Sequence, residues 1–204
     1  MELNITPINK EVTWDKNLEL VSKTDKFGNI QYCNEAFVNV SGYEDFELVG
    51  KAHNIIRHPE MPKVIFKLLW DNLKKGTDFH AVIKNMAKTG RYYWVITQFE
   101  IQKNEDGEII NYIGRRKAVN QNTISTFEAL YIKLKQIEDA VSVEASEDYL
   151  IGFLDDKKMS YAEFLENTLL KDTNNQITYS QNTATESKTE TKKGKRSFFS
   201  VLFG

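Results

Sequence analysis

Two segments carry the side chains best suited to chemistry. Residues 53–62 read HNIIRHPEMP and residues 84–95 read KNMAKTGRYYWV, with Trp70 on a predicted helix between them. Two histidines, an arginine, a carboxylate and several aromatic rings are poor material for a plain core, because buried polar groups cost free energy unless they are paired. The same side chains suit the wall of a ligand pocket.

Each of these residues also has a structural explanation. A histidine near a helix start often caps the helix or lies on the surface, and His53 and His80 are assigned this role. Trp70 alone fits a core position, and in this explanation Arg57 and Glu60 would form a simple ion pair at a helix entrance. Only the two segments taken together favour a pocket.

Composition limits the class of protein. The chain has 204 residues, 41% of them apolar, and a net charge of −2. This fits one domain with extensions and gives no reason to expect nucleic-acid binding. The one cysteine, Cys33, excludes an intrachain disulfide and a Cys-rich zinc site. No stretch approaches the roughly 18 apolar residues that span a bilayer, and no signal-peptide pattern opens the chain, so we expect a cytoplasmic protein.

The sequence divides into five segments by composition and periodicity. They are an N-terminal lead-in (1–17), a sensor domain with nearly all strand signals (18–120), a helical signalling or interaction region (121–171), a disordered linker (172–196) and an apolar docking tag (197–204).

Strand and turn signals alternate in the sensor domain. LELVSKT and IQYC form a first hairpin, FHAVIKNM and RYYWVITQFEI a second, and EIINYIGRRKA a third strand after the Asp106-Gly107 turn. The long strand alternates, with Tyr93 and Thr97 on one face and Trp94 on the other. One face is expected to look into the core.

Residues 34–75 are predicted to be helical. Asn34 suits an N-cap, Gly42 a helix end, and a longer helix starts at Pro62 and stops at Gly76. Its apolar side chains cover more than half of its circumference, so it should bury against the sheet.

This element order is that of a PAS domain, an α+β fold. It has a five-stranded antiparallel sheet with short connector helices on one face, followed here by C-terminal helices and a disordered tail. Over residues 18–120 the sequence also resembles the FAD-binding PAS domains of bacterial aerotaxis and energy-taxis receptors, the Aer family. The resemblance rests on NEAF (34–37), VSGY (40–43), GKAHN (50–54), RHPEMP (57–62), LW (69–70), KN (84–85), YWV (93–95) and GRR (114–116).

The resemblance implies a noncovalent FAD held between the sheet and the connector helices. Five positions match those that the family uses to hold or tune the flavin, and two more are candidate wall residues. The first set is Asn34, Arg57, His58, Glu60 and Trp70, and the second is Asn85 and Trp94.

These residue types suit a flavin. The ring becomes anionic on gaining an electron unless it is protonated, so Arg57 and His58 are candidates for charge compensation. Trp70 offers a flat apolar surface. The family has Asp at the position of Glu60, which keeps the charge and adds one methylene.

A heptad-like seam follows the sheet. Asn122 or Ser125 can cap a helix there, with Ser125 and Glu128 spaced as a capping box. The seam either forms a homodimer or partner interface or packs on its own domain. Its residues are Phe127, Leu130, Leu134, Ile137 and Val141.

The last residues combine charge and apolar side chains. Basic residues at 192–196 precede the aromatic run SFFSVLFG. This suits docking either to a membrane surface or to a hydrophobic groove of a partner.

These features predict a cytoplasmic FAD-binding redox sensor for energy taxis, with no catalytic turnover and no metal. It would report to a membrane-bound chemoreceptor and so lie at the inner face of the membrane. Because the chain shows neither anchor nor signalling domain, it resembles the stand-alone CetB-type PAS subunits. Two alternatives stay open: a cofactor-free PAS interaction or dimerisation module, and a sensor of haem or another small ligand.

Overall fold

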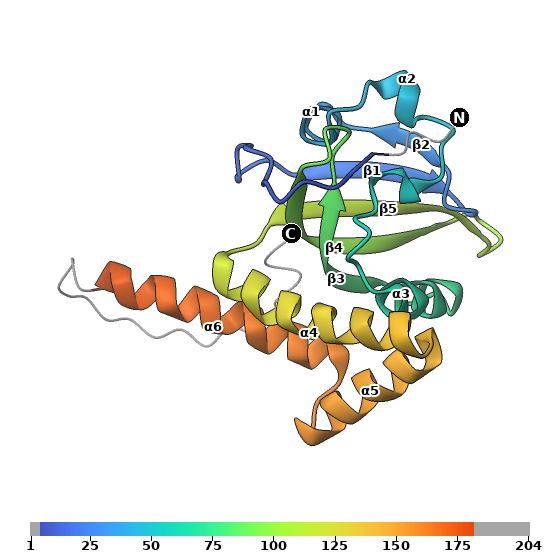
Figure 1. The fold of residues 1–204 in the computed structure, drawn as a ribbon. Coiled ribbons are helices and arrows are strands. Elements are labelled where there is room, and N and C mark those ends of the chain that lie inside the picture. Colours follow the sequence, from blue (N-terminus) through green and yellow to red (C-terminus); the bar gives the residue numbers. More distant parts are fainter. Residues whose placement is uncertain (1–4, 182–204) are drawn as a thin grey trace, which may run out of the picture.

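A five-stranded antiparallel sheet organises the protein (Figure 1). The computed structural model describes residues 5–181, with side chains described up to residue 171. The strands are β1 (Leu20–Asp25), β2 (Ile30–Cys33), β3 (Phe79–Met86), β4 (Tyr92–Lys103) and β5 (Ile109–Ala118), in the spatial order β2-β1-β5-β4-β3. The predicted PAS fold is confirmed.

The turn between β1 and β2 is held by one side chain. The Asp25 carboxylate accepts hydrogen bonds from the backbone amides of Phe27 and Asn29 and from the Asn29 side chain. Gly28 adopts φ +87°, a conformation that favours glycine. The turn therefore has one defined shape beside the connector helices.

Short helices connect the two hairpins. They are α1 (Glu35–Ser41), α2 (Asp45–Leu48), the 3-10 helix η1 (His53–Ile56) and α3 (Lys63–Lys74). Asn34 caps α1 by accepting from Phe37 N, and Gly42 ends it at φ +70°, as predicted. Pro62 is the N-cap residue of α3 and has no side chain that could cap the helix.

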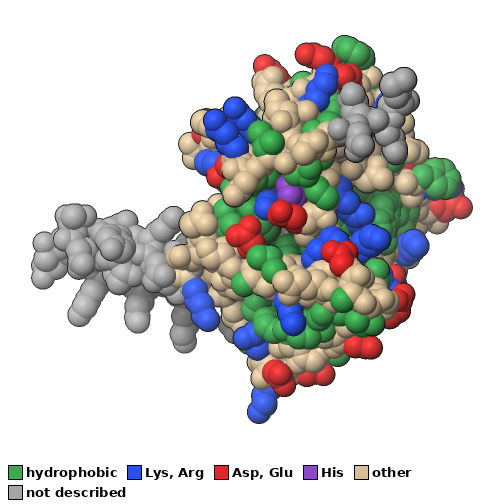
Figure 2. Space-filling model, in the orientation of Figure 1, with side chains coloured by type: hydrophobic (Ala, Val, Ile, Leu, Met, Phe, Trp, Pro, Cys, Tyr) green, Lys and Arg blue, Asp and Glu red, His purple; other side chains and the backbone are tan. Residues whose placement is uncertain are grey.

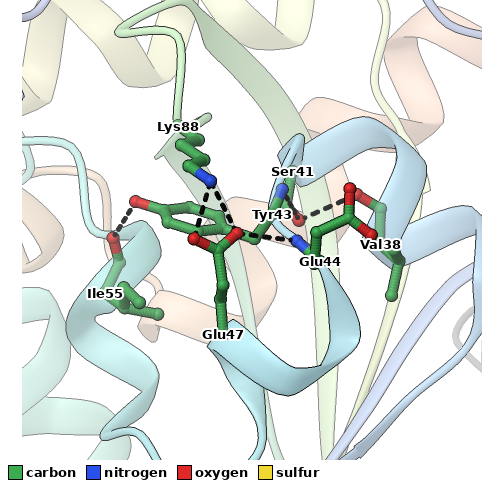
Figure 3. A network of polar contacts seen from close by, with 7 residues as sticks. All are labelled: Val38, Ser41, Tyr43, Glu44, Glu47, Ile55 and Lys88. Carbon is green, nitrogen blue, oxygen red and sulfur yellow. Dashed lines mark hydrogen bonds and ion pairs between the residues drawn. The ribbon is translucent and has the colours of Figure 1, made fainter.

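A polar network fastens this connector to the β3–β4 turn (Figure 3). Lys88 Nζ lies 2.6 Å from both carboxylate oxygens of Glu47 in α2. The Tyr43 hydroxyl donates to Ile55 O in the 3-10 helix. The connector is thus tied to the sheet at one end before it reaches α3.

Three helices follow the sheet. The first and third pack against β3, and the first two lie beside α3 in Figure 1. The three are α4 (Gln121–Ala140), α5 (Val143–Asp156) and α6 (Tyr161–Gln181). Asn120 caps α4 by accepting from Thr123 N at 2.9 Å. The predicted caps Asn122 and Ser125 lie inside the helix, where the Ser125 hydroxyl donates to Gln121 O.

Both faces of the long strand β4 are therefore buried. Tyr93 and Thr97 point to the connector side, whereas Trp94 stacks on Tyr131 of α4 with ring centroids 6.3 Å apart. The Tyr131 hydroxyl donates to Val82 O at 2.7 Å. The prediction of one core-facing side was incomplete, because it did not include a second helical layer.

The heptad-like seam is used inside the chain. Phe127, Leu130 and Leu134 are buried, and the Phe127 ring lies 5.3 Å from that of Phe164 in α6. Val141 at the end of the seam is 72% exposed. The alternative in which this helix packs on its own domain is the one seen in the structure.

The helical region extends further than its predicted boundary at residue 171. Helix α6 continues to Gln181, through residues 172–181, which contain neither glycine nor proline to stop it. The rest of the predicted linker and the apolar tag lie outside the described residues. No helix in the described part is both long and apolar enough to cross a membrane.

Charges of both signs are interspersed on the face shown in Figure 2. Neither Lys and Arg nor Asp and Glu dominate it. This differs from the single-sign basic stripe that is typical of a nucleic-acid-binding face.

Candidate functional site

A cavity of about 300 Å³ lies between the sheet and the connector helices. Alternate residues of β1, β3, β4 and β5 form the sheet side, and the 3-10 helix and α3 form the other. Phe27 and Gly28 of the β1–β2 turn also line it. The cavity is on the side of the sheet away from α4.

Helix α3 supplies an apolar wall. Phe66, Leu69, Trp70 and Leu73 line the cavity. The Trp70 ring meets that of Tyr112 edge to face, with centroids 5.6 Å apart. A Cβ atom at Gly28 would lie 3.4 Å from Trp70, about van der Waals contact, so the turn lies against the indole. These aromatic and leucine side chains form the α3 side of the cavity.

Arg57 lies at the junction of the connector and β3. Its backbone pairs with that of Asn85 in an isolated antiparallel bridge, and its guanidinium lies 3.5 Å from the centroid of the Phe66 ring. Burial lowers the pKa of Arg57, and the nearby Glu138 carboxylate opposes that shift. Arg57 thus brings a positive charge to the cavity wall.

Two polar atoms on the sheet side have no partner among the described residues. They are Asn85 Nδ2 and Thr97 Oγ1, both buried and both on residues that line the cavity. An unpaired buried polar group costs about 1–3 kcal/mol. A ligand with a polar edge would supply the missing hydrogen bonds.

A third polar group was missed by the sequence analysis. Arg116 is only 2% exposed, and it donates to Ser22 Oγ at 3.0 Å and to His53 Nε2 at 3.0 Å. All three side chains line the cavity. The sequence pattern could have identified Arg116, because it follows Tyr112 and Gly114 at a spacing of two and so lies on the same, inward face of the strand.

The structure places His58 and Glu60 outside the cavity. His58 is buried in the turn before α3, where its Nδ1 accepts from Glu60 N at 3.3 Å. Burial, and then Lys84, lower the pKa of His58 to about 4. Glu60 is 66% exposed at its side chain and lies 2.6 Å from Lys84 Nζ. Both residues shape the loop that carries Arg57.

Asn34 and Trp94 also lie away from the cavity. The Asn34 amide caps α1 and bonds to β1, accepting from Val21 N and donating to Glu19 O. Trp94 is on the α4 side of the sheet. Of the predicted site residues, the cavity brings together Arg57, Trp70 and Asn85.

Comparisons with known proteins agree with this architecture. Residues 30–116 match the family model of the PAS fold. The aerotaxis receptor of Escherichia coli K12 is 39% identical over 112 residues, which is 55% of this chain and 22% of the receptor. A nitrogen fixation regulatory protein of Klebsiella pneumoniae is 24% identical over 140 residues, 64% of this chain and 28% of that protein.

Solved structures share the fold. A light-oxygen-voltage domain studied with a flavin analogue superposes with a TM-score of 0.50 at 21% identity, covering 54% of this chain and 84% of that one. Residues 30–116 therefore have the PAS fold. Among proteins with this fold, the sequence is similar to the aerotaxis receptor of Escherichia coli, and the chain spans less than a quarter of that receptor's length.

Proposed function

We propose that this protein is a redox sensor whose cavity holds the ring of a noncovalently bound FAD. The observation that carries the proposal is the pairing of a flat apolar wall at Trp70 with the unpaired Asn85 amide and Thr97 hydroxyl on the facing sheet. A flavin ring is planar, is apolar at one end, and has carbonyl and N–H groups at the other. The residues present fit it.

The cavity is large enough for the flavin ring but too small to enclose the whole FAD molecule. At about 300 Å³ it is at the small end of ligand pockets. The adenylate part of FAD would therefore extend past the enclosed space. When bound, the flavin supplies reversible electron transfer; the protein supplies the slot, the hydrogen bonds and the electrostatic setting.

Related proteins favour a flavin. Similarity to an aerotaxis receptor is highest among the relatives described above, and the light-oxygen-voltage domain was studied with a flavin analogue. The histidines favour it over haem. His53 is the histidine that lines the cavity, and its Nε2 already accepts a hydrogen bond from Arg116, so it is not free as an axial ligand.

Helices α3 and α4 supply a route for the signal. One side of α3 lines the cavity, while its first turn is capped by the Glu138 carboxylate of α4, which accepts from Lys63 N and Val64 N at 2.8 Å each. A change in charge or hydrogen bonding in the cavity that shifts α3 would therefore alter the docking of α4. A coupling of about 1–3 kcal/mol is typical of such linkage.

The proposed receiver is a membrane-bound chemoreceptor, with the sensor on the cytoplasmic side. Similarity to the aerotaxis receptor supports this partner class. Since the seam of α4 is buried within the chain, the exposed parts of α4 and α5 are the surfaces that such a partner would contact.

The absorption spectrum of the purified protein tests the proposal, with FAD added to any colourless fraction. Flavin bands that bleach on reduction are expected. A colourless protein that takes up no FAD would instead support a cofactor-free interaction module, and a Soret band would support haem.

Variants test the location of the flavin. Asn85→Ala and Trp70→Leu should each weaken FAD binding by roughly tenfold, the equivalent of about 1.4 kcal/mol. Asn72→Ala is the control, because Asn72 is on α3 but bonds to Leu68 O outside the cavity lining. Equal FAD affinity in all three variants would place the flavin elsewhere.

A further inference from the structure

Arg116 is a buried positive charge without a carboxylate partner among residues 5–171. Its Nη1 donates to Ser22 Oγ and, at 2.8 Å, to Gly114 O, and its Nη2 donates to His53 Nε2. Its neighbour Arg115 differs: that side chain is 35% exposed and pairs with Glu19 and Glu100. Burial lowers the pKa of Arg116 to about 10, which still leaves it cationic at neutral pH.

The titratable groups around Arg116 are neutral. Because a guanidinium can only donate, His53 Nε2 must be the unprotonated nitrogen. Burial, and then Arg116, lower the pKa of His53 to about 3. Burial raises the pKa of the Cys33 thiol to about 12 and also raises that of Tyr93. None of these groups carries a negative charge to offset Arg116.

The guanidinium is positioned toward the cavity. A Cβ atom at Gly114 would lie 2.6 Å from Nη2 and 2.9 Å from Nη1 of Arg116, so the missing side chain makes room for the arginine to fold back over its own strand. Thr97 is directly opposite Arg116 in the β4–β5 register, and its hydroxyl is buried and unpaired. A cation without a carboxylate partner and an unpaired hydroxyl that line the same cavity mark a place for an anion.

We propose that Arg116, held by Ser22, Gly114 and His53, is a binding residue for a negatively charged group on the ligand. For the flavin of the proposed function, on which this inference rests, the group is the reduced ring and not a phosphate. Arg116 then favours the ring state that has gained an electron without a proton. This moves charge compensation from the predicted pair, Arg57 and His58, to a residue on the sheet.

The setting favours the ring over a phosphate. A flavin phosphate is permanently charged and strongly hydrated, whereas Arg116 is almost fully enclosed. The partly exposed Arg57 is the better phosphate partner. A ring whose charge appears only on reduction can enter the enclosed end in its neutral state.

Two variants and a matched control test the proposal. Arg116→Gln removes the charge, Gly114→Ala displaces the guanidinium without removing it, and Arg115→Gln removes a charge from the same strand on its other face. Each variant of the 204-residue chain is loaded with FAD and titrated with dithionite, which supplies the electron, and the potential is measured. Affinities for oxidised riboflavin, FMN and FAD are measured in parallel.

Arg116→Gln should bind oxidised flavins within about threefold of the parent protein. Its affinity for the charged reduced flavin, relative to the oxidised flavin, should fall at least about tenfold. This loss lowers the one-electron potential by about 59 mV. Gly114→Ala should lower the potential by a smaller amount, and Arg115→Gln should leave it unchanged. A potential equal to that of Arg115→Gln overturns the proposal. So does weaker binding of FMN and FAD with unchanged riboflavin, which would assign Arg116 to a phosphate.

A flavin-free measurement separates this inference from the flavin proposal. Benzoate should raise the melting temperature of the flavin-free protein more than benzamide, its neutral counterpart. The difference should vanish in Arg116→Gln and persist in Arg115→Gln. If the protein binds no flavin but shows this difference, the anion site stands and the redox function fails. No difference in the parent protein overturns the anion site.

Discussion

Glu138 is expected to stabilise the protein by capping a helix 75 residues away in sequence. The first turn of α3 has backbone N–H groups that need acceptors, and its N-cap residue Pro62 has no side-chain oxygen. The two carboxylate oxygens of Glu138 supply two of these acceptors, one for Lys63 N and one for Val64 N, each at 2.8 Å. Its negative charge also lies at the positive end of the α3 dipole.

The size of the effect follows from these contacts. Glu138→Gln removes the charge and one of the two carboxylate oxygens. Losing a helix cap costs about 0.5–2 kcal/mol, and the charge at the dipole accounts for about 0.3–1 kcal/mol of it. We therefore expect the unfolding free energy to fall by about 1–1.5 kcal/mol, which lowers the melting temperature by roughly 2–6 °C in a chain of this size.

Urea denaturation measures this loss as a lower midpoint at an unchanged slope. Glu128→Gln is the matched control on the same helix. The Glu128 side chain is 43% exposed and lies 3.6 Å from Lys84 Nζ, so its removal should cost less than about 0.5 kcal/mol. If Glu138→Gln is no more destabilising than Glu128→Gln, the cap does not act as described, and the proposed signal route through α3 loses its contact.

Further expectations concern the second helical layer, the pH response and the turn beside the cavity. Tyr131→Phe leaves the Val82 carbonyl without its hydroxyl donor and should lower the unfolding free energy by about 1–2 kcal/mol; an unchanged urea midpoint would refute this. Because the pKa of His53 is about 3 when folded and 6.5 when unfolded, the unfolded chain binds the extra proton between these values. The contribution of His53 to stability should thus fall as the pH drops below about 6.5, by roughly 2 kcal/mol at pH 5; His53→Gln should show a flatter urea-midpoint profile than the parent protein, and a parallel profile would contradict the cause. Gly28→Ala should cost about 1–2 kcal/mol because of its positive φ, and thermal unfolding at or above the parent temperature would disprove that strain.

Local signals were enough to predict the fold. Hairpin turns, the Asn34 cap and the Gly42 stop depend on neighbouring residues, so the strands and short helices follow from their order along the chain. The short turns account for the antiparallel pairs β1–β2, β3–β4 and β4–β5, whereas the distant pair β1–β5 was expected only from the resemblance to a PAS domain. The α4 cap was misplaced by a few residues because several polar residues in a row are all able to cap a helix.

The site was harder to predict because side-chain direction depends on distant layers. Period-two alternation assigns Trp94 and Tyr93 to opposite faces of β4, but it does not say which face holds the cavity when helices bury both. His58 follows Arg57 directly, and the turn before α3 directs it into the loop. Arg116 was part of a recognised motif, yet its missing carboxylate is visible only when its neighbours are in place.

Hydrogen exchange of the FAD-loaded protein in its oxidised and reduced states is the most direct test of redox sensing. If flavin charge is coupled to the docking of α4, the amides of Lys63 and Val64 and those of α4 should exchange at different rates in the two states. A coupling of 1–3 kcal/mol corresponds to about 5- to 150-fold. The Glu138→Gln variant should show a smaller difference. Identical exchange of α3 and α4 in both states, with flavin bound, would contradict the proposed function.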